Sequence, residues 1–105
     1  MKKNQLQTHI DSIKEQLIQK YKAEKIILFG SASVGKATAD SDIDFLVIKN
    51  DKRTFHNRLV NLYSLIKKEV AADFIVYTPD EFSKRLKMGD PFAKYILTNG
   101  KVLYG

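Results

Sequence analysis

The chain has 105 residues, of which 18 are Lys or Arg and 12 are Asp or Glu, so its formal net charge is +6. This length predicts a single domain over residues 1–105, with one sheet covered by helices. The lack of cysteine excludes disulfides and thiolate metal sites. No apolar run approaches the ~20 residues that span a bilayer, so we expect no membrane contact. Many charged residues without cysteine suit a cytoplasmic protein.

The spacing of apolar residues predicts the elements of the first two thirds of the chain. Leu6, Ile10, Ile13, Leu17 and Tyr21 recur at helical intervals, as do Phe55, Leu59, Leu62, Ile66 and Val70. Short β-branched and aromatic runs between these stretches are typical of strands. The resulting order is a helix over 5–22, a strand over 25–29, a loop or short helical turn over 30–41, a strand over 42–49 and a helix over 53–70.

The remaining third of the chain is predicted to begin with a third strand over 73–77. Two helix-start signals follow it. Thr78-Pro79-Asp80-Glu81 predicts a capped helix start, with Thr78 as N-cap and Glu81 completing a capping box. Asp90-Pro91 opens another short helix, which Gly100 closes before a final strand over 102–104. The fold class is therefore α/β or α+β, a small mixed sheet flanked by helices. We expect the motif described next to lie near one sheet edge.

One motif joins the first two strands. Gly30-Ser31 follows the first strand, and Asp42-Ile43-Asp44 begins the second after ten intervening residues. Because side chains alternate along a strand, Asp42 and Asp44 are predicted to share a face. Two carboxylates beside a turn with free backbone N–H groups suit a divalent metal bound against phosphates.

Two better-known motifs share part of this stretch. Gly30 to Lys36 matches most of a phosphate-binding P-loop, but Ala37 stands where the metal-binding hydroxyl belongs. The aspartates at 40, 42 and 44 have the spacing of a calcium loop. That loop needs glycine and glutamate where this chain has Phe45 and Asp51. Neither motif explains the stretch.

Each candidate residue also has an ordinary structural explanation. Gly30-Ser31 suits a strand-ending turn, Asp42 suits a cap beside Ser41, and Lys36 suits a solvated loop. Asp44 and Asp73 are harder to explain in this way, because each adjoins apolar residues of a predicted strand, where burying an unpaired acid is costly. Taken together, the residues favour a site.

The chain resembles the minimal nucleotidyltransferase group of the polymerase-beta-like nucleotidyltransferase superfamily. The resemblance is carried by Leu28-Phe29-Gly30-Ser31, Ser41 to Val47, Asp73 to Val76, Thr78 to Phe82, and the ending from Ile96 to Gly105. It implies that Asp42, Asp44 and Asp73 ligate one or two Mg²⁺ ions and are catalytic. It also implies that Gly30 and Ser31 contact the triphosphate of ATP. Lys36 is a further candidate for the phosphates, since Ala32, Ser33 and Val34 replace the large side chains of many relatives.

The same resemblance implies a partner, because the chain has no room for an acceptor-binding domain. In this group the protein is an antitoxin that transfers AMP from ATP to a HEPN-domain ribonuclease toxin. The alternatives are a non-catalytic module that neutralises its partner by contact, and transfer to a small molecule or RNA. A second copy of the chain is another candidate partner. Direct nucleic-acid binding is not favoured, although the charge outside the three acids is 18 basic against 9 acidic residues, or +9.

Overall fold

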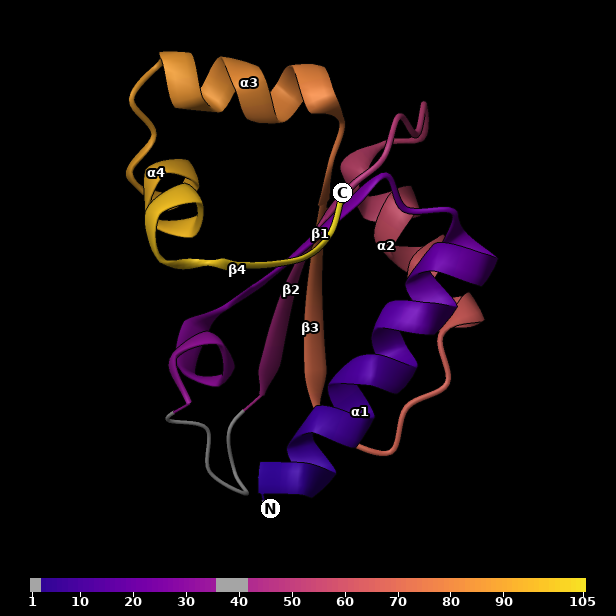
Figure 1. The fold of residues 1–105 in the computed structure, drawn as a ribbon. Helices are drawn as coiled ribbons and strands as arrows, with labels where there is room; N and C mark the ends of the chain where they lie inside the picture. Colours follow the sequence, from indigo (N-terminus) through magenta and orange to yellow (C-terminus); the bar gives the residue numbers. More distant parts are fainter. Residues whose placement is uncertain (1–2, 36–41) are drawn as a thin grey trace.

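A mixed sheet of order β3-β2-β1-β4 forms the centre of the molecule (Figure 1). The structure is a computed structural model that describes residues 3–35 and 42–105. β2 is parallel to β3, whereas β1 is antiparallel to both β2 and β4. The strands are β1 (Lys25–Phe29), β2 (Ile43–Ile48), β3 (Ala72–Tyr77) and β4 (Lys101–Tyr104).

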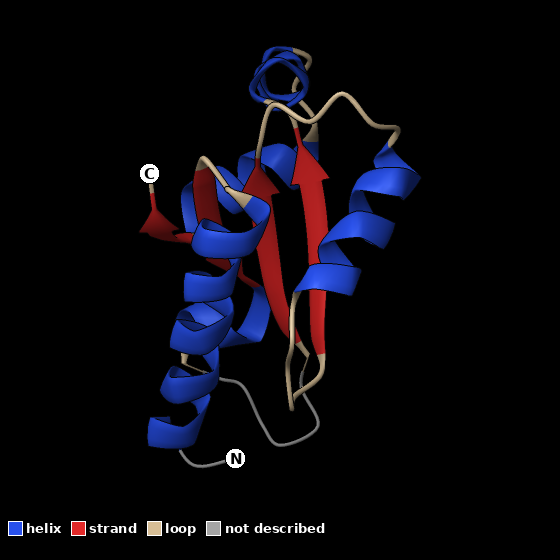
Figure 2. Cartoon of the chain, turned by 90° about the vertical axis from the view of Figure 1, so that its right-hand side faces the viewer, coloured by secondary structure: helices blue, strands red, loops and turns tan. Residues whose placement is uncertain are grey.

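Helices cover both faces of this sheet. On one face lie α1 (Lys3–Gln16), continued by the π-helical turn η1 (Leu17–Tyr21), and α2 (Phe55–Leu65). In Figure 2 this face is toward the viewer, and α1 and α2 lie next to each other in front of the sheet, with strands visible between them. On the other face lie α3 (Pro79–Lys87) and α4 (Pro91–Asn99). These helices confirm the predicted α/β class.

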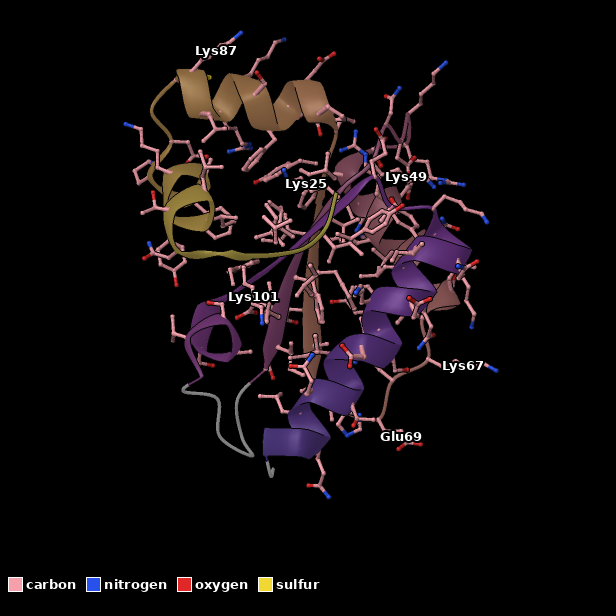
Figure 3. The ribbon with its side chains drawn as sticks, viewed as in Figure 1. Lys25, Lys49, Lys67, Glu69, Lys87 and Lys101 are labelled. Atoms are coloured by element: carbon pink, nitrogen blue, oxygen red, sulfur yellow. The ribbon has the colours of Figure 1, made fainter. Side chains whose placement is uncertain are left out.

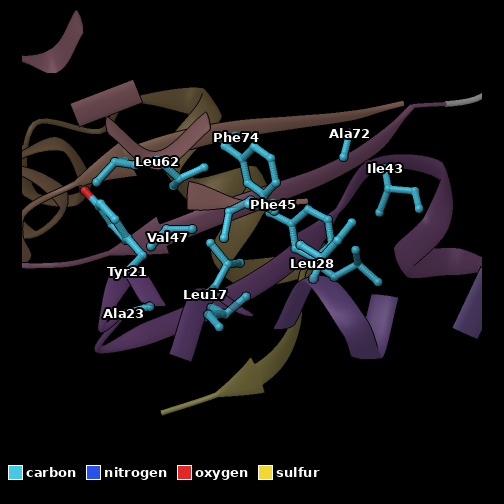
Figure 4. Close-up of a cluster of buried hydrophobic side chains, with 14 of the residues drawn as sticks. Leu17, Tyr21, Ala23, Leu28, Ile43, Phe45, Val47, Leu62, Ala72 and Phe74 are labelled. Atoms are coloured by element: carbon cyan, nitrogen blue, oxygen red, sulfur yellow. The ribbon is translucent and has the colours of Figure 1, made fainter. Parts of the chain in front are cut away.

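The larger core lies between the sheet and the pair α1 and α2 (Figure 4). Successive residues of β2 alternate between the two cores: Phe45 and Val47 face α1 and α2, whereas Leu46 faces α4. Phe45 and Phe74 stack with ring centroids 5.4 Å apart. This period of two places Asp44 on the same face as Leu46, the face that α3 and α4 cover only in part.

Two predictions about the fold are wrong. β1 and β2, which carry the motif, lie in the centre of the sheet rather than near its edge, because β4 pairs with the outer side of β1. The helix predicted over 53–70 ends at Leu65. The Gln16 side chain there bonds both main-chain groups of Lys67, accepting from its N–H at 2.6 Å and donating to its C=O at 2.7 Å. These bonds hold the segment in a non-helical path.

The predicted capping box at the start of α3 is confirmed, and it forms part of a larger link. Thr78 accepts a hydrogen bond from the Glu81 N–H, and the Glu81 carboxylate accepts one from the Thr78 N–H. The same carboxylate pairs with the buried Arg58 of α2 at 2.6 and 3.2 Å. Glu81 therefore fixes α2 and α3 to the same end of the sheet.

Replacing Glu81 by glutamine is expected to lower the free energy of unfolding by about 2 kcal/mol, less than for a fully buried pair because Glu81 is half-exposed. The hydrogen bond from Arg58 is the main cause that holds the pKa of Glu81 below its ordinary value of 4.5. Because the folded pKa is the lower one, this stability is present above about pH 4.5 and is lost as the pH falls through the folded pKa.

Urea unfolding at neutral and acidic pH measures both effects. The wild type should lose more stability on acidification than Glu81→Gln, while the neighbouring Asp80→Asn should behave like the wild type at both values. An equal acid response in wild type and Glu81→Gln would contradict the expected role of this ion pair.

None of the helices that the structure describes is both long enough and apolar enough to cross a membrane.

Candidate active site

Three strand ends meet at the lower end of the sheet in Figure 1, where β1 finishes and β2 and β3 begin. Asp44 pairs in register with Phe29 of β1 on one side and with Asp73 of β3 on the other. Residues in register on adjacent strands place their side chains on the same face of a sheet. The structure thus brings Asp44 and Asp73 together, although the sequence separates them by 29 positions.

Gly30 makes room for the Asp44 carboxylate. Its φ is +74°, and a Cβ at this position would overlap Asp44 Oδ2. The chain then forms a single 3₁₀ turn, η2 (Gly30–Val34), in which the Ser33 hydroxyl donates to the Gly30 carbonyl at 2.8 Å. The loop or short helical turn predicted over 30–41 is confirmed as a helical turn over Gly30–Val34, and residues 36–41 lie outside the described residues. Glycine is needed at position 30 both for its backbone conformation and for the close approach of the acid.

Burial and neighbouring carboxylates raise the pKa of Asp44 and of Asp73. Burial is the largest cause of the raised pKa of Asp44, followed by the negative charges of Asp73 and Asp42. The pKa of Asp73 is raised by burial, then by a hydrogen bond with Asp42 and by its charge. Such mutual repulsion among neighbouring carboxylates is relieved by a bound cation.

These carboxylates do not form a ready-made metal cage. Within residues 3–35 and 42–105, no three Asp, Glu, His or Cys side chains converge closely enough to hold a metal ion. The raised pKa values of Asp44 and Asp73 do not require such close convergence, because charges act on one another over longer distances than the 2.0–2.6 Å of a metal–oxygen bond. Asp42 and Asp73 have exposed side chains. Rotation of these side chains would be needed to bring three carboxylates onto one ion.

The remaining predicted site residues are Ser31, which the structure describes, and Lys36, which it does not. Ser31 is half-buried in η2, directly after Gly30, and its main-chain carbonyl accepts a hydrogen bond from the Gly35 N–H. Lys36 lies outside the described residues. The glycine-serine turn and the carboxylates therefore lie at the same end of the sheet.

Two neighbours of the site were not predicted. The Tyr63 hydroxyl accepts a hydrogen bond from the Phe74 N–H at 3.3 Å, which brings it beside the start of β3. Burial raises the pKa of Tyr63 most, and the charges of Asp73 and Asp42 raise it further. The positive charge of Lys68 acts on Asp73 and partly offsets the rise in its pKa. The helix predicted over 53–70 would have placed Lys68 on a helical turn, so no sequence signal pointed to this position.

Two cavities lie elsewhere on the surface. One, of about 500 Å³, lies between the end of α3 and the start of α4, and the other, of about 420 Å³, lies between α1 and residues 67–69. The carboxylates line neither of them. The acids therefore lie at the end of the sheet, outside both cavities, with Asp42 and Asp73 exposed and Asp44 partly buried.

The fold built around these strands is that of a nucleotidyltransferase. A crystal structure of a putative nucleotidyltransferase from Sulfolobus solfataricus matches it with a TM-score of 0.54 at 22% sequence identity, over 75% of this chain and 71% of the other. At this identity the likeness concerns the fold alone.

The chain belongs to the "Polymerase beta, Nucleotidyltransferase" family, which matches residues 11–105. It is also 34% identical over 83 residues to a Methanocaldococcus jannaschii protein described as a putative protein adenylyltransferase. That match covers 77% of this chain and 78% of the relative. The family assignment thus includes β1, η2 and β2, which surround the motif, and β3, which carries Asp73.

Proposed function

We propose that the chain transfers AMP from ATP to a hydroxyl group of an acceptor protein, with Mg²⁺ held by Asp42, Asp44 and Asp73. The observation that carries the proposal is the register of Asp44 beside Asp73, with Gly30 against the Asp44 carboxylate. Membership of the family and the described relative support the same class of reaction.

The residues suit an in-line displacement at the α-phosphorus of ATP. Mg²⁺ bound to the three carboxylates would neutralise charge on the attacking and leaving oxygens. Asp73 lies at the exposed end of an edge strand, where it would accept the proton of the acceptor hydroxyl. The acceptor oxygen then forms a bond to the α-phosphorus, and the bond to pyrophosphate breaks. Gly30 and Ser31 would contact the phosphates, together with Lys36.

The acceptor that we propose is a HEPN-domain ribonuclease toxin, neutralised by the transfer. The resemblance to the minimal nucleotidyltransferase group suggests this partner, and the relative described as a putative protein adenylyltransferase supports a protein as the acceptor. The family match takes up residues 11–105, so any recognition of the acceptor by these residues uses the surface of the catalytic core itself.

The transfer is tested with purified chain, a HEPN-domain acceptor, Mg²⁺ and ATP labelled at either the α- or the γ-phosphate. We expect the acceptor to gain the mass of AMP and the α-label, and EDTA to abolish both gains. Incorporation of the γ-label instead would identify phosphate transfer and contradict the proposal.

A second function, neutralisation by contact without catalysis, is favoured by two observations. The described residues offer no preformed metal cluster, and η2 carries only small side chains and Val34 where many relatives have larger ones. An Asp42→Ala/Asp44→Ala double variant separates the two functions. Full protection against the toxin by this variant would favour contact, whereas its loss would favour AMP transfer.

A further inference from the structure

A groove of about 420 Å³ lies between α1 and residues 67–69, which follow α2. Its walls carry three lysines, Lys20, Lys67 and Lys68, and one carboxylate, Glu69. Figure 3 shows the Lys67 and Glu69 side chains projecting from this segment beside α1. The groove therefore has an excess of positive charge and attracts anionic groups.

The wall formed by residues 67–69 is held in place by α1. Gln16 bonds the main chain of Lys67 through both its N–H and its C=O, and the Gln16 amide also lies 3.3 Å from the Ser12 hydroxyl. Because these bonds use the main chain of Lys67, its ammonium group takes no part in building the wall.

The same wall leads to the candidate active site. Glu69 is separated from Asp73 by only three residues, and the Lys68 ammonium lies 3.3 Å from the Val70 carbonyl. The charge of Lys68 lowers the pKa of Asp73 against the effect of burial, so the two side chains are electrostatic neighbours. The groove lies on the α1 face and the carboxylates on the other face, so the two sites meet only at the end of the sheet.

We propose that this groove docks an acidic segment of the acceptor protein, whose hydroxyl reaches the carboxylates around the end of the sheet. The inference rests on the proposed AMP transfer and adds the way in which the acceptor is held. A peptide suits the groove better than RNA for two reasons. Glu69 would oppose a continuous row of phosphates, and the only ring among the lining residues is that of His9, whereas single-stranded RNA sites use aromatic stacking.

Docking is tested without ATP, using a fluorescent random copolymer of glutamate and tyrosine and measuring its anisotropy. The variant Lys20→Glu/Lys67→Glu leaves Lys68, the neighbour of Asp73, unchanged. Lys84→Glu/Lys87→Glu on α3 is the matched control, since it changes the net charge equally away from the groove. We expect binding about tenfold weaker in the groove variant and near the wild-type value in the control.

Equal weakening in both variants would overturn the proposal, because general charge attraction would then explain binding. It would also be overturned if the groove variant lost binding to oligouridylate but not to the copolymer, which would assign the groove to RNA.

AMP transfer to the same copolymer separates docking from the proposed function. The groove variant should raise the KM for the copolymer and leave kcat and the KM for ATP unchanged. Groove-dependent binding without any transfer by the wild type would contradict the proposed function and support docking. Transfer with equal KM in wild type and groove variant would overturn docking alone.

Discussion

If Asp44 helps to hold Mg²⁺ as proposed, replacing it by asparagine should reduce AMP transfer by about a thousandfold or more, since the metal would supply several kcal/mol of transition-state stabilisation. The same change should raise the free energy of unfolding of the metal-free protein by about 1 kcal/mol. Asparagine keeps the shape of aspartate but removes a partly buried charge that Asp73 and Asp42 repel. Activity and stability are thus expected to move in opposite directions.

Initial rates of AMP transfer and urea unfolding in the presence of EDTA measure the two effects. Asp80→Asn, an exposed change in the first turn of α3, is the control and should keep the wild-type rate. Loss of both activity and stability in Asp44→Asn would indicate a structural role for this acid and contradict the assignment.

Replacing Gly30 by alanine should cost about a hundredfold or more in activity, because the new methyl group would displace the Asp44 carboxylate. The left-handed backbone should add about 1–2 kcal/mol of strain. Gly35 offers a matched control, since its φ of +72° is nearly the same and a methyl group there would meet no described atom within 4 Å.

Gly35→Ala should therefore share the loss of stability from backbone strain but retain most of the activity. The comparison uses thermal unfolding and initial rates of AMP transfer for both variants. If the two alanine variants lose activity equally, the contact between Gly30 and Asp44 is not the reason that position 30 needs glycine.

Local patterns were sufficient to predict most elements. The strand Lys25–Phe29 and the capping box Thr78 to Glu81 both occur as predicted, because each depends on neighbours in the chain. The end of α2 was mispredicted for the opposite reason. Apolar Ile66 and Val70 continue the helical period, but Gln16, some fifty positions earlier, bonds the Lys67 main chain in a non-helical segment.

In the candidate site, too, local patterns predicted some features, and strand pairing decided the others. Alternation along a strand predicts that Asp42 and Asp44 share a face, although β2 begins only at Ile43, and an acid in an apolar strand marked Asp73 as a candidate. The register of Asp44 with Asp73 depends on the parallel pairing of β2 and β3, which no local pattern specifies. Tyr63 and Lys68 were not predicted as neighbours of the site, because only that pairing and the early end of α2 bring them there.

The most direct test of the central claim is Mn²⁺ binding, followed by the loss of the free-ion electron paramagnetic resonance signal in the presence of a non-transferable ATP analogue. The account predicts that the wild type and Asp80→Asn bind Mn²⁺ together with the analogue, and that Asp44→Asn binds it at least about tenfold more weakly. Equal Mn²⁺ binding by Asp44→Asn and the wild type would contradict the claim that these carboxylates form the metal site.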